Sequence, residues 1–202
     1  MLVDHLIYAA PDLPAAVAEV EERFGVRPQS GGKHLGAGTH NALLALGPRT
    51  YLEILAPDPE QPVRPETRRL QGLTHGRLAG WAIACDDIDG AVARARRHGY
   101  APGEVIDGQR TGSTGTVLWW RATLLAPRDG MVPFLICWGD TEHPASTAPA
   151  GLLLEFLHIE HPDPPSLVPL LTALSAHVDV KPAMTPALVA RLNGPHGVTV
   201  LR

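Results

Sequence analysis

Two side chains that can bind metals or transfer protons lie inside apolar segments near the start of the chain. His5 belongs to the apolar stretch 2–10, and Glu53 interrupts the apolar run 51–56. Burying a lone carboxylate costs free energy, so Glu53 must have a partner or must face water on one side of its strand. A carboxyl group in such surroundings can act as a general base, which makes Glu53 the candidate catalytic residue. For His5, a hydrogen-bonded structural histidine is an equal alternative to a ligand.

A metal site at these two residues would need further ligands, because catalytic zinc usually has three from the protein. His40 opens the strand that precedes Glu53, so it is the candidate to join His5 and Glu53 as a metal ligand. His34 and His143, both expected in loops, are the alternatives.

A second set of residues is predicted to bind substrate. It consists of His40, Asn41, Trp138 and His143. The pair His40-Asn41 has an alternative interpretation as turn chemistry, since asparagine favours turns. Trp138 has the alternative of packing in the core.

These residues belong to a β–α unit that occurs twice, at 4–18 and again at 81–93. The aspartates that begin the two helices, Asp12 and Asp87, are 75 positions apart (87 − 12). Each is a helix N-cap type followed by apolar residues at helical spacing. A duplicated module predicts a cleft between two halves, with functional groups along it.

The remaining pattern extends each unit into a module. The first is predicted to contain a strand at 2–10, a helix from Asp12 to Gly25, a glycine-rich loop at 29–39, and a hairpin of strands 41–46 and 50–56. The second is predicted to contain a strand at 78–85, a helix from Asp87 to Gly99, a loop at 108–115, and strands 116–125 and 132–138 around a turn at 127–130. Segments 57–69 and 139–150 are the expected linkers.

A third, partial module is expected at the C-terminus. A strand at 151–160 precedes a helix with Ser166 as its predicted cap, which places Pro169 in the first turn. The last residues favour a hairpin of 187–192 and 197–202, with a short helix at 186–193 as the alternative. The expected units are therefore 1–58, 76–140 and 150–202, in one compact molecule.

Composition narrows the class of protein. The 202 residues are 45% hydrophobic and 19% charged, with a net charge of −4 and no basic run. This balance favours a globular protein and argues against nucleic acid or an anionic membrane as the partner. Cys85 and Cys137 lie in strand-like apolar runs and are expected to be core residues. No secretory signal is recognised at the N-terminus, so a cytoplasmic location is expected.

The order of these elements resembles the vicinal oxygen chelate superfamily, and the glyoxalase-like domain subgroup in particular. The resemblance rests on a histidine seven residues before an Asp-Leu helix start, His5 to Asp12-Leu13, and on the Glu53 strand 51–57. Segments 36–43 and 133–140 also resemble that subgroup. It implies an α+β fold in which tandem βαβββ modules form curved mixed sheets around a cleft, plus a partial third βα-hairpin module.

The resemblance also implies chemistry. In the superfamily each module supplies one first-strand and one last-strand ligand, and the divalent metal, which could be Zn, Fe, Mn or Ni, acts as a Lewis acid. The first module keeps His5 and Glu53. By position, the second carries Gly80 and a residue near Leu135, and neither can bind a metal.

Two functions are therefore expected as alternatives. One is a lyase, isomerase or dioxygenase of the glyoxalase type that acts on a small oxygenated metabolite. The other is a metal-free protein that sequesters a small molecule, as the bleomycin-resistance members of the superfamily do. The resemblance also makes a homodimer plausible.

Overall fold

The computed structural model describes residues 2–112, 115–123 and 130–202. Its elements, in chain order, are β1 (Val3–Ala9), α1 (Leu13–Phe24), β2 (Gln29–His34), β3 (Thr39–Gly47), β4 (Thr50–Pro57), α2 (Pro65–Gln71), β5 (Arg77–Ala84), α3 (Ile88–Arg97), β6 (Val105–Thr111), β7 (Val117–Thr123), β8 (Phe134–Cys137), η1 (Pro144–Ser146), β9 (Leu153–His161), α4 (Pro164–Ala173), β10 (Asp179–Pro182), β11 (Ala187–Gly194) and β12 (Gly197–Leu201).

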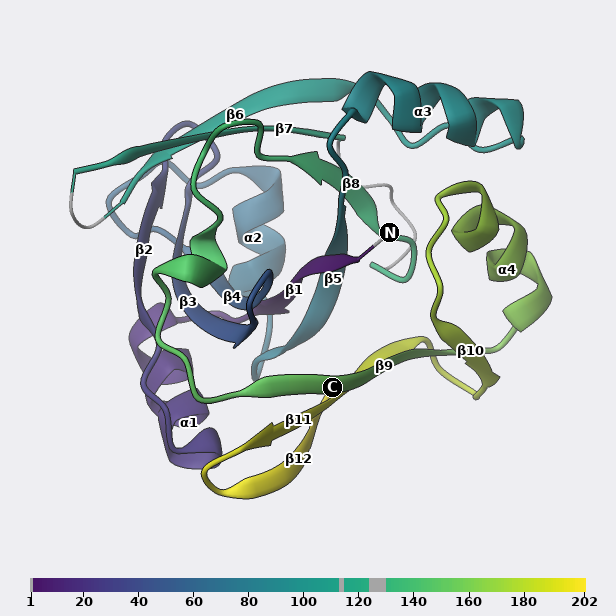
Figure 1. The fold of residues 1–202 in the computed structure, drawn as a ribbon. Helices are drawn as coiled ribbons and strands as arrows, with labels where there is room; N and C mark the ends of the chain where they lie inside the picture. The colour runs from purple at the N-terminus through teal and green to yellow at the C-terminus, as the bar shows by residue number, and fades with distance from the viewer. Residues whose placement is uncertain (1, 113–114, 124–129) are drawn as a thin grey trace.

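Eight strands close into a barrel in the order β1-β4-β3-β2-β6-β7-β8-β5, four from each module (Figure 1). In each module the first strand runs parallel to the last, β1 with β4 and β5 with β8. The modules join where β1 pairs antiparallel with β5, and where Lys33 of β2 pairs with Thr111 of β6. The predicted α+β fold of tandem βαβββ modules is confirmed, and the space between the modules is the barrel interior.

The duplicated helices begin as their sequences predict. The Asp12 side chain accepts a hydrogen bond from the Ala15 amide at 2.8 Å, and the Asp87 side chain accepts one from the Gly90 amide at 2.9 Å. Each bond satisfies an amide that the first helical turn leaves unpaired. Gly25 then ends α1 in the left-handed conformation, with φ of 74°. Helix α1 packs on β3 and β4, and α3 packs on β8.

Three segments differ from the sequence-based expectation. The predicted loop at 29–39 contains β2, and the predicted loop at 108–115 overlaps β6. Both strands are rich in glycine and polar residues, so they lack the apolar alternation that identifies a strand. The expected linker at 57–69 contains the start of α2. Most of the predicted turn at 127–130 lies outside the described residues.

The C-terminal unit is a separate four-stranded sheet in the order β10-β9-β11-β12. The predicted hairpin is confirmed, since Asn193 pairs with Val198 across the β11–β12 turn. The predicted cap is wrong: α4 begins after Asp163, so Pro169 lies inside the helix. Pro164, at the first helical position, begins the helix where a missing N–H has no cost.

One hydrophobic cluster connects the three units. Leu6 of β1, Trp81 of β5 and Leu192 of β11 are all fully or almost fully buried in it. In Figure 1 the C-terminal strands lie below the barrel and α4 lies beside α3. No helix among the described residues has the length and apolar character needed to cross a membrane.

Candidate functional site

The inner face of the barrel brings His5 and Glu53 together. In the parallel pair β1–β4, His5 lies opposite Tyr51 and Ile7 lies opposite Glu53. Because alternate residues of a strand share a face, His5, Tyr51 and Glu53 point to the same side of the sheet. The His5 Nε2 atom lies 3.8 Å from Glu53 Oε2.

Glu53 is a buried carboxylate, with 8% of its surface exposed. Asn41 of β3 donates a hydrogen bond from Nδ2 to Glu53 Oε1 at 2.6 Å. His34 of β2 places its Nε2 atom 3.8 Å from the same oxygen. Oε1 is therefore held by an amide, while Oε2 faces the imidazole of His5.

Asp4 sets the orientation of His5. The pairing of β1 with β5 is irregular between Val3 and His5, so Asp4 lies in a bulge of β1. The bulge lets the Asp4 side chain reach the imidazole of His5. Asp4 is fully buried and accepts a hydrogen bond from His5 Nδ1 at 2.7 Å. Since a carboxylate can only accept, the proton of a neutral His5 is on Nδ1 and the lone pair of Nε2 faces Glu53.

Two residues from the segment that follows β8 also bind Asp4. Trp138 donates from Nε1 to Asp4 Oδ2 at 3.0 Å, and His143 Nε2 lies 3.1 Å from the same oxygen. The Ala145 amide donates to His143 Nδ1 at 3.2 Å, so His143 donates from Nε2. Burial opposes ionisation of Asp4, but the hydrogen bonds from His143 and His5 outweigh it and lower the Asp4 pKa to about 2.

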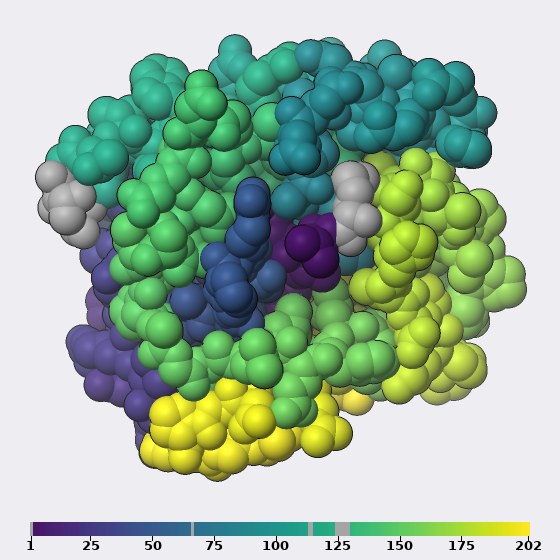
Figure 2. All heavy atoms as spheres, in the orientation of Figure 1, coloured from purple at the N-terminus to yellow at the C-terminus, as the bar shows by residue number. Residues whose placement is uncertain are grey.

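This segment lies over the first module. Helix η1 contacts β3 and β4, and Figure 2 shows the green atoms of segment 139–150 against the blue atoms of the β3–β4 hairpin. The predicted substrate-binding residues Trp138 and His143 therefore lie near His5, on the far side of Asp4. Their observed contacts are those that hold Asp4 in place.

Aromatic rings surround the polar group. Tyr51 stacks on His5 with the ring centroids 4.7 Å apart, and Phe134 meets the His5 ring edge-on at 5.3 Å. Trp120 and Trp138 pack against each other at 5.5 Å. Burial, reinforced by the nearby Glu53 carboxylate, holds the Tyr51 pKa well above its usual value, so Tyr51 is a neutral phenol.

His40 does not join this group. It precedes Asn41 on β3, and because adjacent side chains point to opposite faces, it lies on the outside of the barrel. There it lines two cavities, of about 370 Å³ and 560 Å³, beside β2 and α1. The expectation that His40 would be a ligand with His5 and Glu53 is therefore corrected: His34, the alternative, occupies that place.

His34 is held as a neutral imidazole. Its Nδ1 atom lies within hydrogen-bond distance of Thr39 Oγ1, at 3.0 Å. Burial lowers the His34 pKa, with the opposing attraction of Glu53 too weak to reverse the shift. Its side chain remains 18% exposed, so the group reaches solvent at this point.

Arg110 of β6, like Asp4, is a site residue that sequence reasoning did not select. It is 5% exposed and donates from Nη1 to the carbonyl of Gly31. Its neighbours in β6 are polar and glycine residues, and such a pattern does not reveal which side of the strand is buried. The local sequence therefore contains no pattern that identifies Arg110 as a buried residue.

The second module does not complete a metal centre. Ala82 of β5 lies opposite Phe134, as Ile7 of β1 lies opposite Glu53, so Phe134 holds the position equivalent to Glu53. The residue equivalent to Glu53 is therefore Phe134, one position before the expected Leu135. Gly80 of the second module occupies the position equivalent to His5. No three His, Cys, Asp or Glu side chains in the described parts of the chain are arranged to hold a metal ion. The residues present therefore do not fit the four-ligand centre that the resemblance implies.

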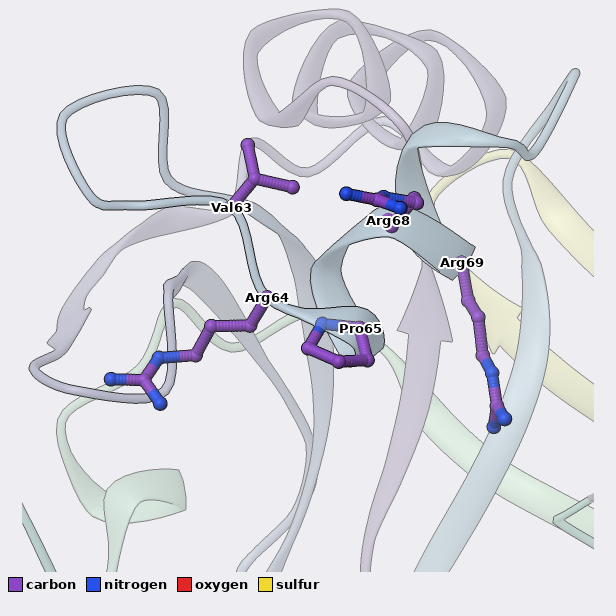
Figure 3. Close-up of a pocket in the computed structure, with 5 residues that line it drawn as sticks. All are labelled: Val63, Arg64, Pro65, Arg68 and Arg69. Atoms are coloured by element: carbon purple, nitrogen blue, oxygen red, sulfur yellow. The ribbon is translucent and has the colours of Figure 1, made fainter.

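A further cavity, of about 360 Å³, lies at the start of α2, away from His5 and Glu53. Its lining residues are Val63, Arg64, Pro65, Arg68 and Arg69. Figure 3 shows Arg64 and Arg69 extending in different directions from this segment. The arginines therefore do not converge on one point.

The comparisons with known proteins agree with this architecture. The family model described as "Glyoxalase-like domain" matches residues 3–175. The chain belongs to the glyoxalase-like domain family. This places it in the vicinal oxygen chelate superfamily, as the sequence indicates. The search of curated proteins found no match.

Solved structures show the same fold. A hypothetical protein from Staphylococcus aureus is 15% identical, with a TM-score of 0.65, and the match covers 94% of this chain and 80% of that one. A methylmalonyl-CoA epimerase in complex with methylmalonyl-CoA and NH4+ is 25% identical, with a TM-score of 0.50 over 70% and 97% of the two chains. A mutant 4-hydroxymandelate synthase from Streptomyces coelicolor is 14% identical, with a TM-score of 0.54 over 98% and 61%.

Proposed function

We propose that this glyoxalase-like protein is an enzyme of the isomerase or lyase type that binds a small oxygenated metabolite inside the barrel. Glu53 would remove a proton from a carbon next to a carbonyl group. The observation that carries this proposal is the buried Glu53 carboxylate, with one oxygen held by Asn41 at 2.6 Å and the other facing His5.

The surrounding residues support such a step. The Asn41 amide fixes the carboxylate, so the oxygen that accepts the proton is held in place before the substrate arrives. Asp4 holds the Nδ1 side of His5, so the Nε2 atom of the neutral imidazole faces Glu53 and can receive the proton from Glu53 or return it. Tyr51 and Phe134 keep the His5 ring in this orientation.

One solved structure that is 25% identical is, by its title, an epimerase. Epimerisation at a carbon that carries hydrogen requires removal and return of a proton, which is the step proposed for Glu53. This likeness supports the reaction class.

Exchange of carbon-bound hydrogen for solvent deuterium tests the proposal without knowledge of the product. We expect the protein to catalyse exchange in at least one member of a panel of small carbonyl compounds, followed by NMR. Glu53→Gln should slow this exchange about 10²- to 10⁴-fold, the range typical of a lost general base. Glu155→Gln, an exposed carboxylate on the C-terminal sheet, is the control and should exchange at the wild-type rate. Equal rates for wild type and Glu53→Gln would contradict the assignment.

Binding without chemistry is the second candidate, and the paired rings of Trp120 and Trp138 favour it, because aromatic faces stack on planar ligands. A protein of this kind would bind its ligand unchanged. The same panel distinguishes the two candidates: bound compounds that show no deuterium exchange at any enzyme concentration would favour sequestration.

A further inference from the structure

Arg110 points into the barrel. It shares a face of β6 with Gly108, two residues earlier. The indole of Trp120 lies directly over Gly108, since a Cβ atom built there would lie 2.3 Å from the ring. Trp120 packs with Ala82 and Ile136 on the inner face, so the guanidinium of Arg110 belongs to the same interior as Glu53.

The positive charge of Arg110 acts on other residues of the site. The guanidinium interacts electrostatically with Tyr51 and Glu53, and it also acts on His34. Burial lowers the Arg110 pKa, against the attraction of Tyr51 and Glu53. The barrel interior therefore contains the guanidinium cation of Arg110, which is largely shielded from water.

The partners of Arg110 differ from those of the exposed arginines. Arg121 is paired with Asp89 at 2.7 Å, Arg191 with Glu155 at 2.8 Å and Arg202 with Glu160 at 2.9 Å. Arg110 donates to the neutral carbonyl of Gly31, and no carboxylate among the described residues lies within ion-pairing distance of it. The most buried of these four guanidinium groups is thus the one without an acidic partner.

This arrangement is costly unless something else supplies the anion. The Glu53 carboxylate attracts Arg110 without forming an ion pair with it. A buried charge that lacks a directly bonded partner of opposite charge costs several kcal/mol. A guanidinium has five N–H donors in a planar fork that fits a carboxylate through two parallel hydrogen bonds. A single carbonyl uses only part of this capacity.

We propose that Arg110 binds the carboxylate of the substrate, which is a small metabolite with a single negative charge. This inference rests on the proposed function of the site and names its substrate class. A single charge fits better than the double charge of a phosphate ester, because Glu53 and Asp4 already place two carboxylates in the same interior. With its carboxylate on Arg110, the substrate would present to Glu53 a carbon–hydrogen bond next to a carbonyl group, which in a 2-oxo acid is at C3.

Isothermal titration calorimetry with the full chain tests this assignment. The probes are 2-oxo and 2-hydroxy monocarboxylates of three to six carbons, their uncharged amides, and inorganic phosphate. Wild-type protein should bind at least one monocarboxylate, and should bind the matching amide and phosphate at least tenfold more weakly, a factor that corresponds to about 1.4 kcal/mol.

Variants identify the residue responsible. Arg110→Gln should weaken carboxylate binding at least tenfold, and Arg110→Lys should fall between it and wild type, because lysine keeps the charge but loses the planar fork. Arg121→Gln, on the outer surface, is the matched control and should bind as wild type does. Thermal melting of each variant shows whether it is folded, and Arg110→Lys keeps the test valid if Arg110→Gln does not fold.

Glu53→Gln separates this proposal from the proposed reaction. It removes a negative charge near the ligand, so it should bind carboxylates at least as tightly as wild type while losing deuterium exchange. Tight carboxylate binding without exchange in wild type would remove the reaction and keep the Arg110 assignment. Wild-type affinity in folded Arg110→Gln, equal affinity for acids and amides, preference for phosphate, or no binding of any monocarboxylate would each overturn the assignment.

Discussion

The two modules of the barrel share a scaffold and differ in the side chains that they direct inward. Both begin with a strand followed by a helix capped by aspartate, and both pair their first and last strands in parallel. At matching positions the first module places Glu53 in the interior and the second places Phe134. Duplication thus supplied two equivalent frames, of which one carries the carboxylate–imidazole pair and the other an aromatic wall and Arg110.

The comparison teaches that equivalent backbone positions need not keep equivalent chemistry. Phe134 contacts the ring of His5, so the second module supports the first module's histidine from the position where a symmetrical site would have a ligand. The result is an asymmetric interior, with an acid and imidazoles on one side and a guanidinium on the other. Such a site suits a ligand whose two ends differ.

The largest effect on stability is expected at Asp4, which has no counterpart in the second module. Asp4→Ala leaves one buried and two partly buried donors without their acceptor, so it should lower the free energy of unfolding by about 3–5 kcal/mol. Ala79 is the matching residue by the 75-position offset, and Ala79→Ser should change stability by less than about 1 kcal/mol. Urea denaturation measures both. If Asp4→Ala lowers the free energy of unfolding no more than Ala79→Ser does, the two positions contribute equally to stability.

The pH dependence of stability should reveal the same difference between the two modules. The Asp4 pKa is about 2 in the folded protein against 3.8 for an ordinary aspartate. The ionised carboxylate therefore stabilises the fold above pH 3.8, and about 2 kcal/mol of stability should be lost as the pH falls from about 4 to 2. Unfolding measured across this range in wild type and Asp4→Asn checks the prediction, because the asparagine variant lacks this titration. Parallel curves for the two proteins would count against it.

A smaller pH effect is expected from His34. Burial lowers its pKa below the ordinary value of 6.5, so the unfolded chain binds a proton more readily than the folded one. Stability should therefore fall as the pH drops below 6.5, by at most about 1.4 kcal/mol per pH unit for one proton. His34→Gln should flatten this slope, whereas His98→Gln, on the exposed end of α3, should leave it unchanged. A slope that survives in His34→Gln would assign it to another group.

The smallest effects should show where the modules are the same. Asp12→Ala and Asp87→Ala each remove one cap of the same geometry, so each should cost about 1 kcal/mol. The measurement is urea denaturation of the two variants side by side. Costs that differ by more than about 1 kcal/mol would mean that the helices do not play equivalent roles in the two halves.

The elements that could be predicted are those whose signal is local. Asp12 and Gly25 bracket α1 because capping and left-handed termination depend on residues within one turn. Strand β2 was missed because glycine, serine and lysine carry no strand pattern, and its strand state comes from pairing with β3. Likewise, Pro169 lies inside α4 because the Pro164-Pro165 pair begins the helix earlier.

The sequence by itself determined the duplicated β–α frame, the presence of His5 and Glu53 on the first and last strands of the first module, and the loss of their partners in the second module. Only the tertiary structure decided that Asp4 turns inward through a bulge, that His34 and not His40 reaches Glu53, and that Arg110 faces the same interior. The physical reason is that strand alternation sets which face a residue takes, while barrel closure sets which distant residues share that face.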